Sequence, residues 1–582
     1  MKNLILLCFF GINLSIFSQV IQLEIDTFNR SIPTANFGGQ TWRGPSWVNS
    51  EFNDSVATMY PDVLAFPPSP DIWDWGNGWF YSQDVLDTCC VDTIFLNWGQ
   101  LNAPVIDITP VNFQIALNQI NAEGLYCLNM ISSSVSKQLS DLHDAKNNGV
   151  SLERIRLGDE MGKAGNELSI SHFPTAEDYA ETCDLYIDSI RDFLPETKIA
   201  VSAGNFGSSN PRAQYWNEAL YDMTNKADAF RWSAFFYLKP SDTIFTTQQL
   251  LAYAFDQIPT YERTRGFQDT IADLQDYELW VGYNITDNTL DKRYANRWSL
   301  VLMLSASNYI FLNNRLVEDI SLFNVGGIFE NWDALDTQDN FRKRATGVFA
   351  EIWNKAKLNK HTASKIKVSN NIIDTVTYYN PNNVPRDVNY PTLFGWRFEN
   401  DSTFEASIIL TNISSQPINI SIDNLLDGNV SWKKWYSDSL FAVIDSVNYI
   451  NTLTDTGTSN IMLPAYSINV AIGECISDVD NDGVCDELEI SGCTNNNACN
   501  YDSFATDNNN CLFPGDNCIF DINGNGVIVY GIYDPNCLCL ENSSYIYEGK
   551  QQKKLITTIS IVGEETLNNY GFLLGIYDDG SI

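Results

Sequence analysis

Short apolar runs alternate with longer amphipathic stretches between about residue 30 and residue 362, and this alternation constrains the fold more than any other feature. Repeated strand and helix over roughly 330 residues predicts a (β/α)8 TIM barrel, for which about 250 residues is typical and longer chains carry insertions. The active face of such a barrel lies at the carboxyl ends of its strands. The runs predicted to be strands are Val63–Phe66, Thr93–Asn97, Arg154–Leu157, Lys198–Ser202, Ala229–Tyr237, Glu278–Tyr283 and Gly326–Phe329.

Three changes of pattern divide the rest of the chain, so we assign residues 19–363 to the barrel. Residues 364–474 alternate apolar and polar positions between turns rich in Asn, Asp, Gly and Ser, which predicts an all-β sandwich. Residues 475–540 are acidic and rich in cysteine and contain no Lys or Arg. Residues 541–582 regain lysines and include the β-like run Leu555–Val562, which predicts a small terminal module.

The first eighteen residues have the pattern of a secretory signal peptide. Lys2 precedes an apolar stretch of about fourteen residues, Leu4–Phe17, which ends in Ser18 and Gln19. This stretch is too short to span a bilayer, and no later segment approaches the length of a membrane span. We therefore expect a secreted or cell-surface protein with no membrane span.

Charge and cysteine content narrow the possible partners and the compartment. The formal net charge is −37, and such a surface repels the phosphate backbone, which excludes nucleic acid as a partner. Thirteen cysteines are present, and eight of them lie between residues 475 and 539. In an oxidising compartment this cluster predicts a disulfide framework, whose pairing the sequence does not reveal.

An acidic loop that begins the C-terminal region has the pattern of a calcium site. Carboxylates at alternate positions precede Gly483, and oxygen ligands around a tight turn suit Ca²⁺. The alternative is a solvated acidic loop. The segment resembles the calcium repeats of thrombospondin type 3 modules, which implies a structural Ca²⁺. For catalysis we expect no cofactor. The residues on the repeat pattern are Asp478, Asp480, Asp482, Asp486 and Glu489.

Two further segments of the last hundred residues resemble known export-associated sequences. Residues 492–506 read G-C-T-N-N-N-A-C-N-Y-D-S-F-A-T, and they resemble a Cys-rich repeat common in surface and secreted proteins of the Bacteroidetes phylum. The run from Lys553 to Gly580 resembles the C-terminal sorting domain of type IX secretion cargo, which implies the secretion machinery as a partner. The basic and apolar residues that usually follow its Asp-Asp-Gly are missing.

A predicted barrel strand delivers an acid at its carboxyl end. Arg154–Leu157 is followed by Gly158, Asp159 and Glu160. This segment resembles the fourth strand of clan A glycoside hydrolases, in particular the α-L-arabinofuranosidase-like members, where G-N-E presents the general acid/base. The resemblance implies that Glu160 is that acid/base, with Asp159 in place of the usual Asn. Glu167, in a second Asn-Glu pair, follows too far into the loop.

The nucleophile that this resemblance implies is missing. A retaining hydrolase needs two carboxyl groups about 5 to 5.5 Å apart. The seventh strand of the family ends in a run like T-E-Y-N, whereas here the run is V-G-Y-N, and Gly282 stands in place of the Glu. A glycine has no side chain to form a covalent intermediate. Asp287, Glu330 and Asp333 are the carboxylates that could substitute for it.

Aromatic and amide side chains near the predicted strand ends are candidates for contact with a sugar ring. Most aromatic residues in such a barrel only pack the core. With three histidines in the chain, a His-rich metal site or a Ser-His-Asp triad has few possible bases. The candidate substrate-binding residues are Trp42, Trp98, Tyr237, Tyr283, Asn284 and Trp332.

Two functions therefore remain open from the sequence. In the first, the protein hydrolyses a polysaccharide or oligosaccharide with Glu160 and an unidentified second carboxylate. In the second, it is a non-catalytic carbohydrate-binding or structural cell-surface protein, a pseudoenzyme that kept the barrel after losing its nucleophile. Gly282 is the residue that separates the two hypotheses.

Overall fold

The chain divides into two compact units, residues 1–478 and 479–582, and each is described by itself. Among the described residues, no helix is long and apolar enough to cross a bilayer. The computed structural model describes residues 20–38, 47–67, 73–74, 79–80, 109–163, 167–204, 212, 215–223, 227–238, 245–265, 277–287, 293–327, 332–379, 384–402, 405–423, 425–426, 429–444, 450–473 and parts of 491–577.

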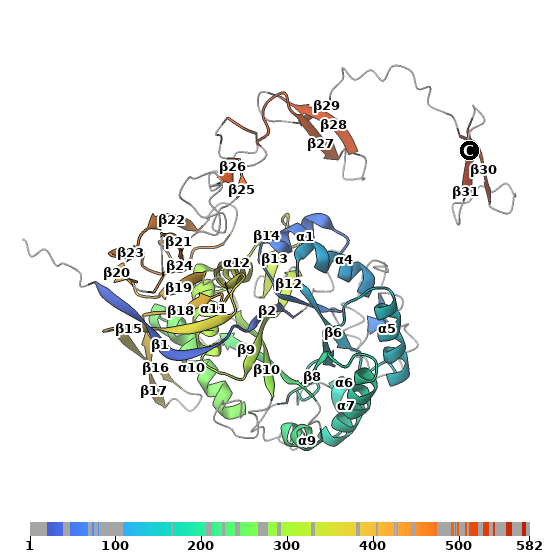
Figure 1. Cartoon of the computed structure of the whole chain (residues 1–582), viewed down its shortest axis with the longest axis horizontal. Helices are drawn as coiled ribbons and strands as arrows, with labels where there is room; N and C mark the ends of the chain where they lie inside the picture. Colours follow the sequence, from blue (N-terminus) through green and yellow to red (C-terminus); the bar gives the residue numbers. More distant parts are fainter. Residues whose placement is uncertain are drawn as a thin grey trace, which may run out of the picture. The chain divides into compact units, whose positions relative to one another are not determined.

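Eight parallel strands close into a ring in the first unit, as the alternation of strand and helix predicts (Figure 1). Apolar side chains fill part of the interior of the ring, where Trp280 packs with Val63, Ala65, Leu125 and other small residues. In chain order the strands are β2 (Thr34–Phe37), β3 (Val63–Phe66), β6 (Glu123–Leu128), β7 (Arg154–Leu157), β8 (Lys198–Ser202), β9 (Ala229–Leu238), β10 (Glu278–Asp287) and β11 (Val317–Leu322).

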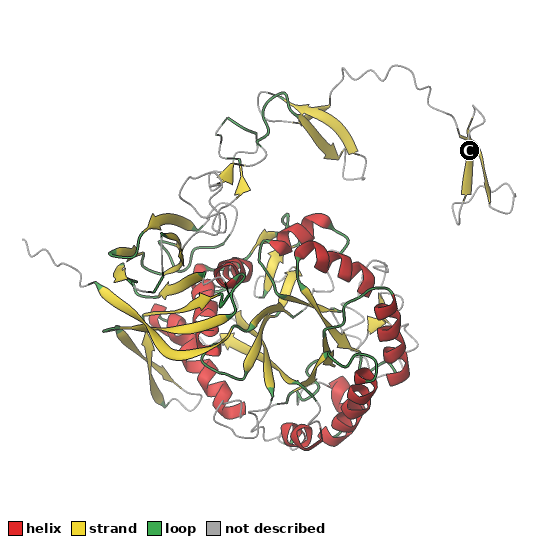
Figure 2. Ribbon diagram, viewed as in Figure 1, coloured by secondary structure: helices red, strands yellow, loops and turns green. Residues whose placement is uncertain are grey.

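Helices surround the ring (Figure 2), and several of them begin with a side-chain cap. Thr109 caps a helix that has Pro110 in its first turn, and Thr175 forms a reciprocal capping box with Asp178. The helices are α1 (Ser50–Ala57), α4 (Pro110–Ile120), α5 (Val135–Asn147), α6 (Glu167–His172), α7 (Ala176–Arg191), α9 (Trp216–Met223), α10 (Thr247–Arg265), α11 (Trp298–Phe311) and α12 (Ala345–Lys357).

The eighth barrel strand differs from the prediction. The predicted run Gly326–Phe329 overlaps β12 (Asn324–Gly327), which pairs with β13 (Asp333–Asp336) outside the ring. The strand that closes the barrel is β11, which begins with Val317-Glu318-Asp319. Two adjacent acids interrupt its apolar pattern, so its period was not visible in the sequence. The predicted strand Thr93–Asn97 lies outside the described residues.

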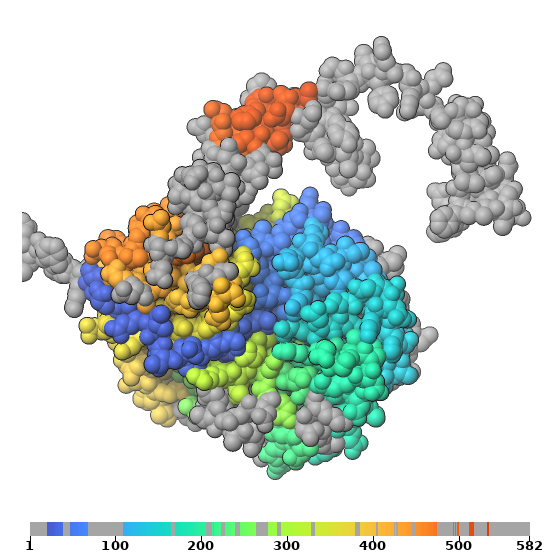
Figure 3. All heavy atoms as spheres, in the orientation of Figure 1, coloured from blue at the N-terminus to red at the C-terminus, as the bar shows by residue number. Residues whose placement is uncertain are grey.

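The second domain of this unit is a nine-stranded sheet that folds around its own core. Its first strand, β1 (Ile21–Ser31), comes from the start of the chain, within the range that the sequence assigns to the barrel. β1 pairs with β15 and β20, and Figure 3 shows this blue segment lying across the second domain. The other strands are β15 (Thr362–Val368), β18 (Leu393–Glu399), β19 (Ala406–Asn412), β20 (Ile418–Ser421), β21 (Val430–Tyr436), β22 (Asn451–Thr456), β23 (Ile461–Leu463) and β24 (Ser467–Gly473).

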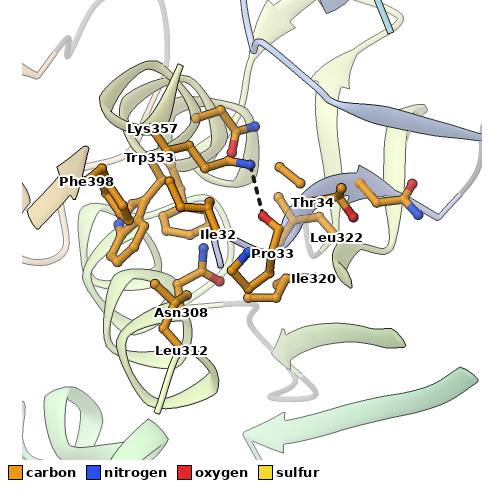
Figure 4. A pocket seen from close by; sticks show the side chains of 14 residues that line it. Ile32, Pro33, Thr34, Asn308, Leu312, Ile320, Leu322, Trp353, Lys357 and Phe398 are labelled. Atoms are coloured by element: carbon orange, nitrogen blue, oxygen red, sulfur yellow. Dashed lines mark hydrogen bonds between the residues drawn. The ribbon is translucent and has the colours of Figure 1, made fainter. Parts of the chain in front are cut away.

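Two barrel helices, α11 and α12, lie against this sheet. The Ser305 hydroxyl lies 2.6 Å from that of Thr411, and Trp298 donates its indole N–H to the Tyr466 carbonyl at 2.6 Å. A small cavity of about 30 Å³ remains on the outer side of β2, where Lys357 donates to the Pro33 carbonyl (Figure 4). It has room for a water molecule or two and none for a sugar ring.

The second unit consists of small pieces of sheet. A disulfide joins Cys493 to Cys511, and Cys499 is also disulfide-bonded, so the expectation of disulfides in the Cys-rich region is confirmed. The Leu555–Val562 run contains a strand, as predicted. The strands are β25 (Ser491–Gly492), β26 (Asp507–Asn508), β27 (Asn517–Asp521), β28 (Ile528–Tyr533), β29 (Cys539–Glu541), β30 (Leu555–Ser560) and β31 (Leu573–Tyr577).

Candidate functional site

The loop after β7, the fourth strand of the ring, holds Glu160 in an unusual backbone conformation. Gly158 has a φ of +70° and Glu160 a φ of +56°, so the chain passes twice through the left-handed region within three residues. Met161 anchors the loop, since its N–H donates to the Ser202 hydroxyl at 2.9 Å and its carbonyl accepts from Arg212 at 2.9 Å. A strained acidic residue held this firmly is typical of a functional position.

Glu160 is half-buried and carries an altered acidity. Burial raises the pKa of its carboxyl, and the adjacent Asp159 raises it further. Lys163, which forms an ion pair with Glu160, opposes this shift of the pKa. The Lys163 ammonium also lies over the ring of Phe235 at 4.2 Å, so it links the fourth and sixth strands. A raised pKa widens the pH range over which a carboxyl group is protonated and can donate a proton.

Asp159, the second residue of the predicted catalytic pair, faces a different partner. Its Oδ1 lies 3.6 Å from the guanidinium of Arg156, a buried residue of β7. The two neighbouring acids are therefore each matched with a cation, Glu160 with Lys163 and Asp159 with Arg156.

The seventh strand, β10, divides its residues between the interior and the exterior of the ring. Trp280 belongs to the interior cluster, and Gly282 and Asn284 share its face because successive side chains alternate. Tyr283 points outward: its hydroxyl donates to Asn308 Oδ1 at 2.9 Å, and its ring packs on Phe311. Tyr283 was predicted to bind substrate, but burial beneath α11 leaves it no access to the interior.

The inner face of Gly282 is occupied by Arg231 of β9. A Cβ built on Gly282 would lie 1.8 Å from Nη2 of Arg231 and 2.3 Å from its Cζ. No substituent fits there unless the arginine moves. The position at which the family resemblance places a nucleophilic carboxylate is thus filled by a guanidinium, and the sequence did not reveal this.

Of the carboxylates considered as substitutes, two serve the structure. Asp287 faces outward and accepts the N–H groups of Tyr294 and Ala295 at 2.7 and 3.1 Å. Asp333 is fully buried, accepts from the Asn324 amide at 3.0 Å and lies 3.6 Å from Arg344. Glu330 lies outside the described residues, and Glu167 is the first residue of α6.

Aromatic side chains lie near the end of the sixth strand and after the eighth. Tyr237 is 43% exposed, and its pKa is raised by burial and by Glu160. Phe235 packs against Phe323, which packs against the predicted contact residue Trp332, with ring centroids 5.2 and 5.4 Å apart. Phe323 was missed because it follows the unrecognised eighth strand. Trp42 and Trp98 lie outside the described residues.

The predicted calcium ligands Asp478, Asp480, Asp482, Asp486 and Glu489 also lie outside the described residues. The described residues contain no cluster of three metal-binding side chains. The calcium site therefore stays a prediction.

Neither a known family model nor a curated protein matches the sequence. Solved structures do match the fold. An α-L-arabinofuranosidase from Thermotoga maritima has a TM-score of 0.58 at 15% identity, over 78% of this chain and 99% of its own. A family 51 α-L-arabinofuranosidase from Bifidobacterium longum has a TM-score of 0.58 at 12% identity, over 78% of this chain and 99% of its own.

The fold is that of the family 51 arabinofuranosidases. A 4-O-α-L-rhamnosyl-β-D-glucuronidase from Fusarium oxysporum matches as well, with a TM-score of 0.53 at 11% identity over 78% of this chain and 100% of its own. The barrel and the second β domain, and their order in the chain, are thus those of known glycoside hydrolases. At these identities the likeness concerns the fold, and the chemistry must be argued from the residues.

Proposed function

We propose that this glycoside-hydrolase-like barrel binds a polysaccharide or oligosaccharide without cleaving it through a covalent intermediate. One observation carries the proposal: the inner face of Gly282 holds the Arg231 guanidinium. Double displacement needs a carboxylate on the face of the sugar opposite the acid. A guanidinium is always protonated in this pH range and is not a nucleophile.

The remaining half of the site supports saccharide binding. Phe235 lies beside the Lys163–Glu160 ion pair, and Phe323 and Trp332 extend this aromatic group away from it. Sugar rings stack on apolar ring faces of this kind. The Asn284 amide nitrogen, on the face of Gly282, is buried and has no hydrogen-bond partner among the described residues. A buried donor of this kind is satisfied when a ligand oxygen arrives.

Hydrolysis by Glu160 is the second candidate, and its raised pKa is the observation that favours it. An inverting arrangement would need another carboxylate about 6.5–9.5 Å away to activate water. Asp319, on β11, is an inward acid at this depth, but it accepts hydrogen bonds from Thr34 and Asn36 at 3.0 and 3.2 Å. Glu330 remains a candidate from the sequence alone.

The test measures binding and product release on the same protein. We expect retention on one or more polysaccharides of a panel that includes arabinan, with no release of reducing ends. Release that is abolished by Glu160→Gln and unaffected by Glu177→Gln, an exposed control on α7, would establish hydrolysis instead. A rescue arm uses Gly282→Glu combined with Arg231→Ala, because the space for a carboxylate exists only when the guanidinium is removed.

We also propose that the protein is exported and reaches the cell surface or the medium. The apolar stretch after Lys2 and the sorting-like terminus support export through a signal peptide and the type IX secretion machinery. We also propose a structural Ca²⁺ at Asp478–Glu489. The spacing of the acidic residues in this segment of the sequence supports it.

A further inference from the structure

Arg231 is a buried cation that has no ionic partner among the described residues. Its side chain belongs to the barrel interior, the residue is 6% exposed, and no carboxylate of the described residues lies within 4 Å of its guanidinium. Within the part of the chain that the structure describes, its one hydrogen bond is a long one, from Nη1 to the Trp280 carbonyl at 3.4 Å. Nε is buried and has no partner among the described residues. Burying a charge in this way is costly unless something compensates it.

The glycine at 282 gives room to this guanidinium, because it lacks the Cβ that would collide with Nη2 and Cζ. Gly38, just after the first barrel strand, also lies near Nη2, at a distance that a Cβ would tolerate. Burial, together with the nearby charge of Arg156, lowers the pKa of Arg231 to about 10, so the group still carries its charge at neutral pH. The barrel thus holds a permanent positive charge at the level of Gly282.

The nearby acids are already engaged by other cations. Asp159 faces Arg156 at 3.6 Å, Glu160 pairs with Lys163, and Asp319 is held by Thr34, Asn36 and Arg154. These acids influence the pKa of Arg231 at longer range but none contacts it. Two unsatisfied donors therefore share this part of the interior, Nε of Arg231 and the amide nitrogen of Asn284.

We propose that Arg231 binds an anionic substituent of the saccharide, the carboxylate of a uronic acid or a sulfate ester. The inference rests on the proposed function, and it adds the chemical class of the ligand. A guanidinium offers paired N–H donors that match the oxygens of either anion. The amide of Asn284 would donate to the same group, while Phe235 and its aromatic neighbours contact the ring.

The experiment is calorimetric titration of the full chain with three oligosaccharides: oligogalacturonate, sulfated galactan and neutral galactan. We expect at least one of the charged ligands to bind tenfold or more tightly than the neutral one, with an affinity that falls as salt rises. The arm that binds identifies the source of the anion. Arg231→Met should weaken that binding at least tenfold, and Arg231→Lys should weaken it less. Arg315→Met, an exposed control just before β11, should not change it.

Unfolding without ligand separates this role from a structural one. A ligand-binding arginine left unpaired in the free protein should make Arg231→Met equal to or more stable than the unaltered protein. A variant that is less stable, and whose binding is unchanged, would show that Arg231 only balances the neighbouring acids. Equal affinity for neutral and charged ligands would overturn the anion proposal and leave saccharide binding standing. Absence of binding in all three arms, and on the polysaccharide panel, would overturn both.

Discussion

The carboxyl ends of the fourth and seventh barrel strands face the same interior but present opposite charges to it. The fourth keeps an acid in a strained, anchored loop, with a pKa raised by burial. The seventh presents a glycine whose inner face is filled by Arg231. An acid is thus held beside the end of the fourth strand, and a buried positive charge fills the inner face of the seventh. The proposed anion-binding role of Arg231 depends on this difference in charge.

The largest expected effect on stability comes from adding a Cβ at residue 282 of the seventh strand. Gly282→Ala places a methyl group 1.8 Å from Nη2, so Arg231 must leave its position. We expect this overpacking to lower the free energy of unfolding by about 3 kcal/mol, measured by chemical denaturation.

The double variant Gly282→Ala, Arg231→Ala provides the control for this prediction. Because the colliding group is gone, the alanine at 282 should cost little in the Arg231→Ala background, and the two changes should be strongly non-additive. Additive effects would mean that the cost arises from the backbone of β10 and not from the guanidinium.

A second prediction tests whether the outward acid beside the site is structural. Asp287→Ala leaves the N–H groups of Tyr294 and Ala295 without their acceptor, and we expect a loss of about 2 kcal/mol in unfolding free energy. Saccharide binding should be unchanged, because Asp287 faces away from the interior. Reduced saccharide binding in a variant that is fully folded at the assay temperature would contradict this prediction. It would show that Asp287 belongs to the binding site.

The smallest expected effect concerns how the contribution of Glu160 to stability depends on pH. The folded-state pKa of Glu160 is raised above its unfolded value, so its contribution to stability is present at low pH and is lost as pH rises through the folded pKa. Glu160→Gln should therefore slightly stabilise the protein at pH 8, and the gain should vanish below about pH 4.

Denaturation across this pH range checks the prediction, and Glu177→Gln serves as the exposed control. A Glu160→Gln variant that is less stable at pH 8 would mean that the ion pair with Lys163 outweighs the cost of burial.

The sequence predicted the barrel because most of its strands are uninterrupted apolar runs between amphipathic helices. It failed at β11, where Glu318 and Asp319 break the run, although both are held by interior or rim partners. At the site, the motif around Glu160 and the absence of an acid at residue 282 were visible. The occupant of that space was not, because Arg231 lies on another strand, and the register between β9 and β10 decides which residues it meets.

The pairing of β1 with β15 and β20 affects how the chain folds. Strands from residues near 25 and near 366 and 420 must meet before this sheet is complete, so its closure depends on contacts across some of the longest sequence separations in the unit. Such contacts form slowly, because the entropy of the large intervening loop is lost before they form. A fragment that begins at residue 364 would lack β1 and expose two unpaired strand edges, which promote aggregation. The barrel and its companion domain should accordingly fold as one unit and resist separation by truncation.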